Sequence, residues 1–179
     1  MTLETLSAWI LAAMIQIAPP DRLAAVPTFP EAQETAEERL GRYGDIADDL
    51  AAEVAQAAPE GQRRNLAALL VAIAWHESGF ARDVDLGPCA PGRVRRGGCD
   101  GGRARTLFQL QAYEPKDRRE AAAIAIRLVR RSYRACASLP REEQLASYAA
   151  GNCRSSTGRA HSRAMVAIAR RLLELPPQS

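Results

Sequence analysis

The sequence predicts a mainly helical single domain with one long loop in its middle. Of its 179 residues, 47% are hydrophobic but only 5% are aromatic, and alanine is abundant throughout. This composition favours closely packed helices, because β-sheets are rich in aromatic and β-branched residues. Apolar residues also recur at helical spacing in several segments. The chain is long enough for one domain with a buried core, and its composition excludes a disordered or collagen-like protein.

Residues 1–30 read as an apolar segment followed by a Pro-rich linker. The stretch 3–18 is apolar except at Glu4, Thr5, Ser7 and Gln16. It is shorter than the roughly 20 apolar residues that a membrane-spanning helix needs. Three interpretations remain open at this point. They are a helix packed on the domain, a weak export or signal-anchor segment, and an interfacial helix that contacts a membrane.

Two helical regions follow. Residues 31–60 are acidic and have a helical pattern, and Gly41 and Gly44 predict a break between two shorter helices. The pattern of apolar residues is clearest from 62 to 78, which predicts the best-defined helix of the chain. Gly79 stands where a left-handed residue would end that helix.

Residues 61–175 are expected to form the functional domain. Its segment 81–106 is rich in glycine and contains two cysteines, which predicts a long loop or a small β-hairpin. Three further helices are predicted, over residues 120–137, 141–150 and 157–173. The second begins after Pro140 with two acidic residues in its first turn, and the third begins at a Ser/Thr cap.

Charge is distributed unevenly along the chain. Residues 1–60 contain eleven acidic residues and three arginines, whereas residues 61–179 contain ten acidic and twenty-one basic residues. The basic part is suited to a polyanion such as an acidic cell-wall polymer, a nucleic acid or a lipid surface. The arginines at 127, 130, 131 and 134 share a helical face, but such a face is usually only solvated, so no nucleic-acid partner is expected.

The four cysteines, at positions 89, 99, 136 and 153, favour disulfides in an oxidising compartment. Three pairings are open, and we expect Cys89–Cys99 to close the Gly-rich loop and Cys136 to pair with Cys153. The chain has no C-x-x-C motif, and neither histidine has a zinc-ligand spacing from a cysteine. We therefore expect no metal site.

Glu77 is the strongest candidate for chemistry. It follows Trp75 and His76 in the last turn of the 62–78 helix and precedes Phe80. The negative end of the helix dipole and the neighbouring aromatic rings both favour the uncharged carboxyl group. A protonated carboxyl group is what a general acid needs. The alternative is an ordinary solvated glutamate at a helix end.

Three short motifs then occur in a recognisable order. They are Glu77-Ser78-Gly79-Phe80, the segment from Ala104 to Gln109 (Ala-Arg-Thr-Leu-Phe-Gln), and the segment from Ala146 to Gly151 (Ala-Ser-Tyr-Ala-Ala-Gly). Together they resemble the Glu-Ser-x-Phe, Gly-Ala-x-Gly-Leu-x-Gln and Ala-x-Tyr-Asn-Ala-Gly signatures of lytic transglycosylases with the lysozyme-like fold. The resemblance covers roughly residues 60–173.

This resemblance implies a lysozyme-like fold and cleavage of the β-1,4 bond between N-acetylmuramic acid and N-acetylglucosamine in peptidoglycan, without cofactor or metal. Glu77 would protonate the glycosidic oxygen and then deprotonate the muramic acid 6-hydroxyl, giving a 1,6-anhydro end. Gln109 and Tyr148 would line the sugar cleft, and Ser78 would hold the glycan or the helix end. Phe108 is expected in the core.

The chain departs from the family signatures at three positions. Arg103 and Thr106 stand where the second motif has glycines, and Ala149 stands where the third has asparagine. If those glycines have positive φ angles, we expect the backbone to be reshaped there. A lysozyme-type hydrolase would also need a second carboxylate, for which Asp83, Asp85 and Asp100 are the candidates.

The resemblance also suggests where such a protein acts. The expected setting is the periplasm, the cell wall or the cell exterior, with a monomer acting on glycan strands. A bacterial enzyme, a phage lysin and a virion-associated enzyme all fit. The alternatives to an enzyme are a catalytically inactive wall-binding relative and a basic helical protein that binds nucleic acid.

Overall fold

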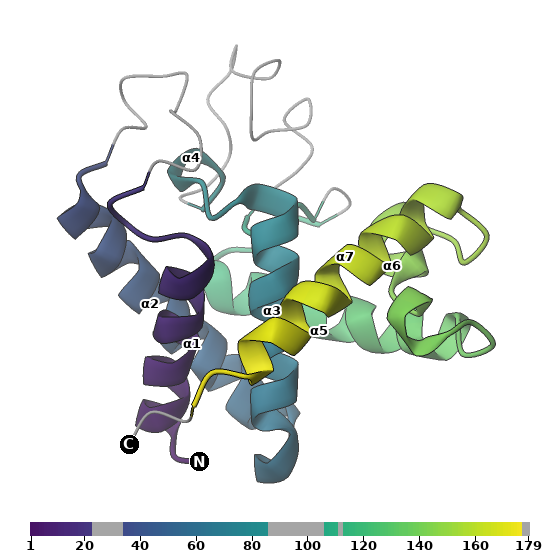
Figure 1. The fold of residues 1–179 in the computed structure, drawn as a ribbon, viewed down its shortest axis with the longest axis horizontal. Coiled ribbons are helices and arrows are strands. Elements are labelled where there is room, and N and C mark those ends of the chain that lie inside the picture. Colours follow the sequence, from purple (N-terminus) through teal and green to yellow (C-terminus); the bar gives the residue numbers. More distant parts are fainter. Residues whose placement is uncertain (23–33, 86–105, 111–112, 177–179) are drawn as a thin grey trace.

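The computed structural model describes residues 1–22, 34–85, 106–110 and 113–176, apart from the side chain of Asp83. The described residues are mainly helical and contain no strand, which confirms the mainly α class. The elements are α1 (Leu3–Ile17), α2 (Ala36–Ala57), α3 (Glu60–Ser78), α4 (Arg82–Asp85), α5 (Arg118–Ala135), the 3₁₀ turn η2 (Arg141–Glu143), α6 (Ala146–Ala150) and α7 (Ser156–Leu173). In Figure 1, α3 stands in the middle, with α1 and α2 on one side and α6 and α7 on the other.

The apolar N-terminal segment is a helix of the core. Thr2 caps α1 by accepting a hydrogen bond from the backbone N–H of Thr5. The helix buries Leu6, Trp9 and Met14 completely, where it packs against α2 and α3. None of the described helices is long and apolar enough to cross a membrane.

The predicted break at Gly41 and Gly44 is wrong, because α2 runs through both glycines as a single helix of 22 residues. A capping box between Thr35 and Glu38 fixes its start, with each side chain bonded to the other residue's backbone N–H. Its inner face buries apolar residues at helical spacing: Tyr43, Ile46, Ala47, Leu50, Ala51 and Val54. Burial of this continuous face outweighs the local preference of two glycines.

The α3 helix forms the centre of the core and ends as predicted. Every residue from 67 to 74 is buried, so the helix is covered on all sides. It packs against α1, α2, α5 and α7. Gly79 ends the helix in the left-handed conformation, with φ 58°, and its N–H bonds to the carbonyl oxygen of Trp75.

The predicted helix over residues 141–150 is interrupted, because η2 and α6 are separate elements. Side chains from neighbouring helices bind the backbone groups that a continuous helix would pair. The Ser132 hydroxyl donates to the carbonyl oxygen of Gln144 at 2.7 Å and accepts from the N–H of Tyr148 at 3.0 Å. The N–H of Leu145 donates to the Ser162 hydroxyl at 3.0 Å. The predicted helices over 120–137 and 157–173 are present as α5 and α7, with ends shifted by one or two residues.

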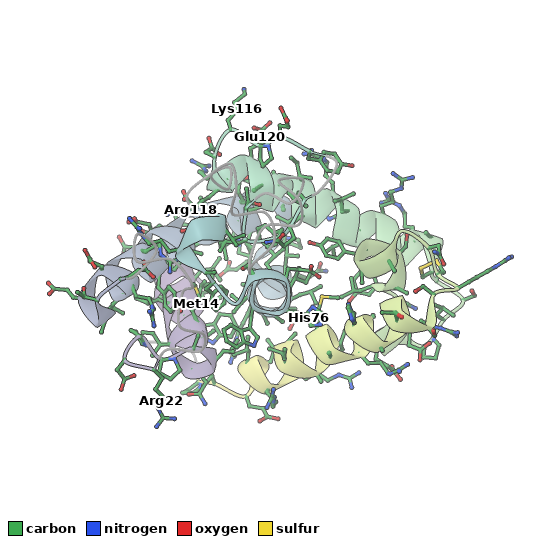
Figure 2. All side chains as sticks on the ribbon, turned by 90° about the horizontal axis from the view of Figure 1, so that it is seen from above. Met14, Arg22, His76, Lys116, Arg118 and Glu120 are labelled. Carbon is green, nitrogen blue, oxygen red and sulfur yellow. A yellow bond between two sulfur atoms is a disulfide. The ribbon has the colours of Figure 1, made fainter. Side chains whose placement is uncertain are left out.

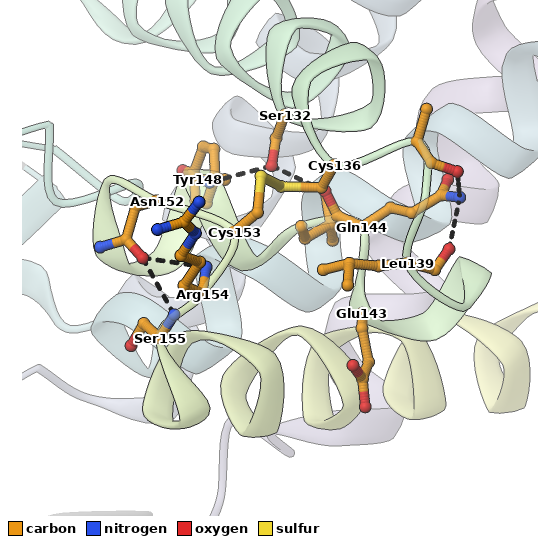
Figure 3. The surroundings of a disulfide bond; sticks show 12 residues. Ser132, Cys136, Leu139, Glu143, Gln144, Tyr148, Asn152, Cys153, Arg154 and Ser155 are labelled. Atoms are coloured by element: carbon orange, nitrogen blue, oxygen red, sulfur yellow. Dashed lines mark hydrogen bonds between the residues drawn. A yellow bond between two sulfur atoms is a disulfide. The ribbon is translucent and has the colours of Figure 1, made fainter.

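One predicted disulfide lies within the described residues. Cys136 and Cys153 are bonded, and their Cα atoms are 5.5 Å apart. The bond joins the end of α5 to the connection between α6 and α7, close to the Ser132–Tyr148 contact (Figure 3). The Cys89–Cys99 pair and the expected Gly-rich loop or hairpin lie outside the described residues.

Two glycine substitutions test this packing. Gly41→Ala is expected to stabilise the protein by about 0.5–1 kcal/mol, because alanine is the better helix former and its Cβ would meet nothing within 4 Å. Gly158→Ala is expected to destabilise it by about 1–3 kcal/mol, because its Cβ would lie 2.8 Å from the Ala146 carbonyl oxygen and from the Ala150 Cβ. Urea unfolding measures both changes. Equal stabilisation by the two substitutions would contradict the tight packing of α7 on α6.

Candidate active site

Glu77 lies at the edge of a cleft. Its side chain, in the last turn of α3, is 23% exposed. The cleft has a volume of about 600 Å³, and the described residues that line it are Glu77, Phe108, Gln109, Leu110, Tyr113, Leu128, Tyr148, Ala149, Ala150 and Gly151. Glu77, Gln109 and Tyr148 come from three separate segments of the sequence and meet here. Phe108 contributes to the wall but is 3% exposed and belongs to the core, as expected.

The turn after Glu77 is held by specific contacts. The Ser78 hydroxyl donates to the carbonyl oxygen of Ala74 at 2.7 Å and accepts from the N–H of Phe80 at 3.2 Å. Ser78 therefore holds the end of the helix, one of its two expected roles. Phe80 has a positive φ of 55°, and its ring packs against the rings of Tyr43 and Trp75 at 5.5 and 5.6 Å. A left-handed aromatic residue is strained, so this packing must offset the cost.

A buried arginine that the sequence analysis did not identify supports the same turn. The guanidinium group of Arg42 donates to the carbonyl oxygen of Phe80 at 3.0 Å, to both carboxylate oxygens of Glu34 at 2.6 Å, and to Asp85 at 3.3 Å. Burial disfavours the charged guanidinium, but the bonds and charges of Glu34 and Asp85 outweigh it and raise the pKa of Arg42. No local sequence pattern marks Arg42, because its partners lie elsewhere in the chain.

The turn that carries Gln109 is strained. Thr106 has φ 67° and Gln109 has φ 49°, and the N–H of Gln109 bonds to the carbonyl oxygen of Thr106 at 3.1 Å. Thr106 therefore has a left-handed backbone although it is not a glycine. Its buried hydroxyl has no hydrogen-bond partner among the described residues. A β-branched residue in this conformation costs about 1–3 kcal/mol. Arg103, the other replacement, lies outside the described residues.

Tyr148 brings a hydroxyl group to the cleft. It is a residue of α6, fixed by the bond from its N–H to Ser132, and its hydroxyl donates to the carbonyl oxygen of Phe108 at 3.4 Å. Burial raises the pKa of the phenol strongly, and the nearby negative charge of Glu77 raises it further. The hydroxyl therefore stays protonated at neutral pH and remains a hydrogen-bond donor beside Glu77.

Of the three candidate second carboxylates, only Asp85 has a described side chain, and it does not line the cleft. The Asp85 side chain is completely buried and bonds to Arg118 at 2.7 and 2.9 Å and to Arg42 at 3.3 Å. It joins α4 to α5 near the labelled Arg118 of Figure 2, and it is not among the residues that line the cleft. We therefore correct its assignment from candidate carboxylate to structural ion pair. The side chain of Asp83 and all of Asp100 lie outside the described residues.

Two histidines meet beside Glu77. Nδ1 of His76 lies 3.5 Å from Oε1 of Glu77, and the rings of His76 and His161 are 4.8 Å apart. His161 is exposed near the start of α7, as expected for a surface residue, but its contact with His76 was not predicted. The labelled His76 of Figure 2 lies between α3 and α7. Among the described residues, no three His, Cys, Asp or Glu side chains are grouped as metal ligands.

Comparisons of the chain with family models, with curated proteins and with solved structures find no match.

Two substitutions of Thr106 measure the strain in this turn. Both Thr106→Gly and Thr106→Ala remove the hydroxyl and the methyl group, but only glycine adopts φ 67° without a Cβ conflict. Thr106→Gly is expected to be more stable than Thr106→Ala by about 1 kcal/mol. Chemical denaturation of the two variants gives this difference. An alanine variant as stable as the glycine variant would show that the turn is not strained.

Proposed function

We propose that this protein cleaves peptidoglycan glycan strands, with Glu77 as the general acid and base. The observation that carries the proposal is the convergence of Glu77, Gln109 and Tyr148 on one cleft. Each of the three comes from a different one of the motifs that resemble those of the lytic transglycosylases. The cleft is large enough for sugar rings, since small-molecule sites commonly have 300–1,000 Å³.

In the proposed reaction, Glu77 donates its proton to the oxygen of the β-1,4 bond while the bond from that oxygen to C1 of N-acetylmuramic acid breaks. The substrate's own acetamido group stabilises the positive charge that develops at C1. The Glu77 carboxylate then removes the proton from the 6-hydroxyl, whose oxygen bonds to C1 and closes the 1,6-anhydro ring. This returns Glu77 to its protonated form, so one residue serves in both steps.

The neighbouring groups are suited to supporting roles. The protonated hydroxyl of Tyr148 would exchange its long hydrogen bond to Phe108 for one to the Glu77 carboxyl group or to the acetamido group of the bound sugar, and so orient it. Gln109, held on its strained turn, would bind the sugar. The contacts of Ser78, Phe80 and Arg42 fix the end of α3 and would keep Glu77 in place.

The alternative within the same proposal is a lysozyme-type hydrolase, which needs a second carboxylate near the cleft. Glu77 is the only carboxylate among the described residues that line the cleft, and Asp85 is engaged with two arginines. These two facts favour the lyase. The Cys136–Cys153 bond supports an oxidising setting, such as the periplasm or the cell exterior.

The first test is Glu77→Gln, which removes the transferable proton and nearly preserves the shape of the side chain. We expect it to abolish release of fragments from peptidoglycan, measured by zymography and chromatography, while leaving the unfolding midpoint nearly unchanged. The matched control is Glu174→Gln, an exposed glutamate at the end of α7, which should keep full activity. Substantial activity in Glu77→Gln would disprove the assignment.

The second test concerns Tyr148 and the products. Tyr148→Phe should slow turnover by about 10- to 100-fold, because it removes an orienting hydroxyl and keeps the ring. Tyr133→Phe is the control, since Tyr133 is also partly buried but does not line the cleft. Mass spectrometry should find products ending in 1,6-anhydromuramic acid. Reducing-end muramic acid as the main product would identify a hydrolase. Substituting Asp83 and Asp100 in turn would then show whether either is its second carboxylate.

A further inference from the structure

A row of unpaired arginines lies on the exposed side of α5. Arg127, Arg131 and Arg134 are spaced by four and three residues, so their side chains share one face of the helix. All three are exposed, and none has an ion pair or a hydrogen bond from its guanidinium group to a described residue. Arg130 differs, because its side chain bonds to the carbonyl oxygen of Ala57.

This row borders the cleft. Leu128, which lines the cleft, lies one residue after Arg127 and one helical turn before Arg131. Residues three apart are neighbours on a helix surface, so Arg131 stands next to the cleft wall. Arg127 and Arg134 flank Arg131 along the helix.

A fourth exposed arginine lies on another element, close in sequence to a residue of the cleft. Arg154 is exposed and follows Gly151, which lines the cleft, by three residues. The disulfide of the preceding Cys153 holds this segment against the end of α5 at Cys136, as Figure 3 shows. We call Arg127, Arg131, Arg134 and Arg154 the arginine rim.

Several other arginines of this region have acidic partners among the described residues. Arg159 and Arg163 of α7 both face Glu143, at 3.9 and 2.5 Å. At the start of α5, Arg118 and Arg119 pair with acidic residues of α2 and α4. The rim thus concentrates uncompensated positive charge beside the cleft, where it attracts an anionic ligand.

We propose that the arginine rim binds the carboxylate groups of the peptides attached to the glycan strand. The inference rests on the proposed function and adds a substrate preference to it. Peptides branch from the lactyl group of the muramic acid residues, so a strand lying in the cleft would extend carboxylates over its edge. Guanidinium groups bind carboxylates through two parallel hydrogen bonds, which suits arginine at this position. The protein should therefore prefer peptide-bearing strands to strands without peptides.

The experiment compares two pairs of substitutions in the Glu77→Gln background, which prevents cleavage during binding. Arg127→Gln/Arg131→Gln removes charge from the rim and keeps good helix formers on α5. Arg170→Gln/Arg171→Gln is the control, because these arginines are exposed in the last turn of α7. That turn contacts Arg64, about 20 Å along α3 from Glu77.

Binding is measured by co-sedimentation with insoluble peptidoglycan and with glycan stripped of its peptides by an amidase. The rim variant should bind peptide-bearing glycan about tenfold more weakly than its parent and stripped glycan equally well. The control pair should bind both like the parent. The preference of the parent for peptide-bearing glycan should also shrink as salt is added.

The outcomes separate the two proposals. If wild type cleaves peptidoglycan but the rim variant binds both glycans like its parent, the inference fails and the proposed function stands. Equal weakening on both glycans, or on duplex DNA or anionic vesicles to the same extent, would show a general polyanion surface and also overturn the inference. If the parent binds neither glycan and wild type cleaves none, the proposed function itself fails.

Discussion

Eight consecutive residues of α3, from 67 to 74, are buried, so this helix must be covered on every side. Four of the eight are alanines, which are small enough for neighbouring helices to approach closely, and α1, α2, α5 and α7 provide the cover. Complete burial ends after Ala74, and the following Trp75, His76 and Glu77 are partly exposed. Glu77 is partly exposed because it lies just beyond the fully buried part of the same helix. The burial of α3 thus determines both the centre of the core and the position of the candidate acid.

The end of α3 needs more than packing, because two successive residues there are left-handed. Arg42 supplies the additional constraint. Its buried guanidinium joins α2 to the turn at Phe80, and through Asp85 the same network reaches Arg118 of α5. Removing one member would leave a buried charge without its partner, which typically costs 3–5 kcal/mol. The network therefore makes the geometry beside Glu77 depend on helices that are distant in sequence.

Features fixed by local chemistry could be predicted from the sequence, whereas features fixed by distant partners could not. Gly79 as the end of α3 and a Ser/Thr cap at the start of α7 are local, and both are present. The continuity of α2 through Gly41 depends on its buried face, and the interruption between η2 and α6 depends on the hydroxyl of Ser132. In the cleft, the motifs indicated Glu77, Gln109 and Tyr148, but nothing local marked Arg42 or the contact of His161 with His76.

The uneven charge of the sequence has a structural basis in α2 and α5. Acidic residues of α2 lie opposite the first turn of α5, where Asp49 is 3.7 Å from Arg118 and Glu53 is 2.9 Å from Arg119. These ion pairs hold α5 against α2. In them, acidic residues of the N-terminal region are paired with arginines of the basic region. The later arginines of α5, from Arg127 onward, meet no described acidic partner, and Arg130 bonds only to the carbonyl oxygen of Ala57 at the end of α2. The geometry of α5 therefore places its own unpaired arginines beside the cleft.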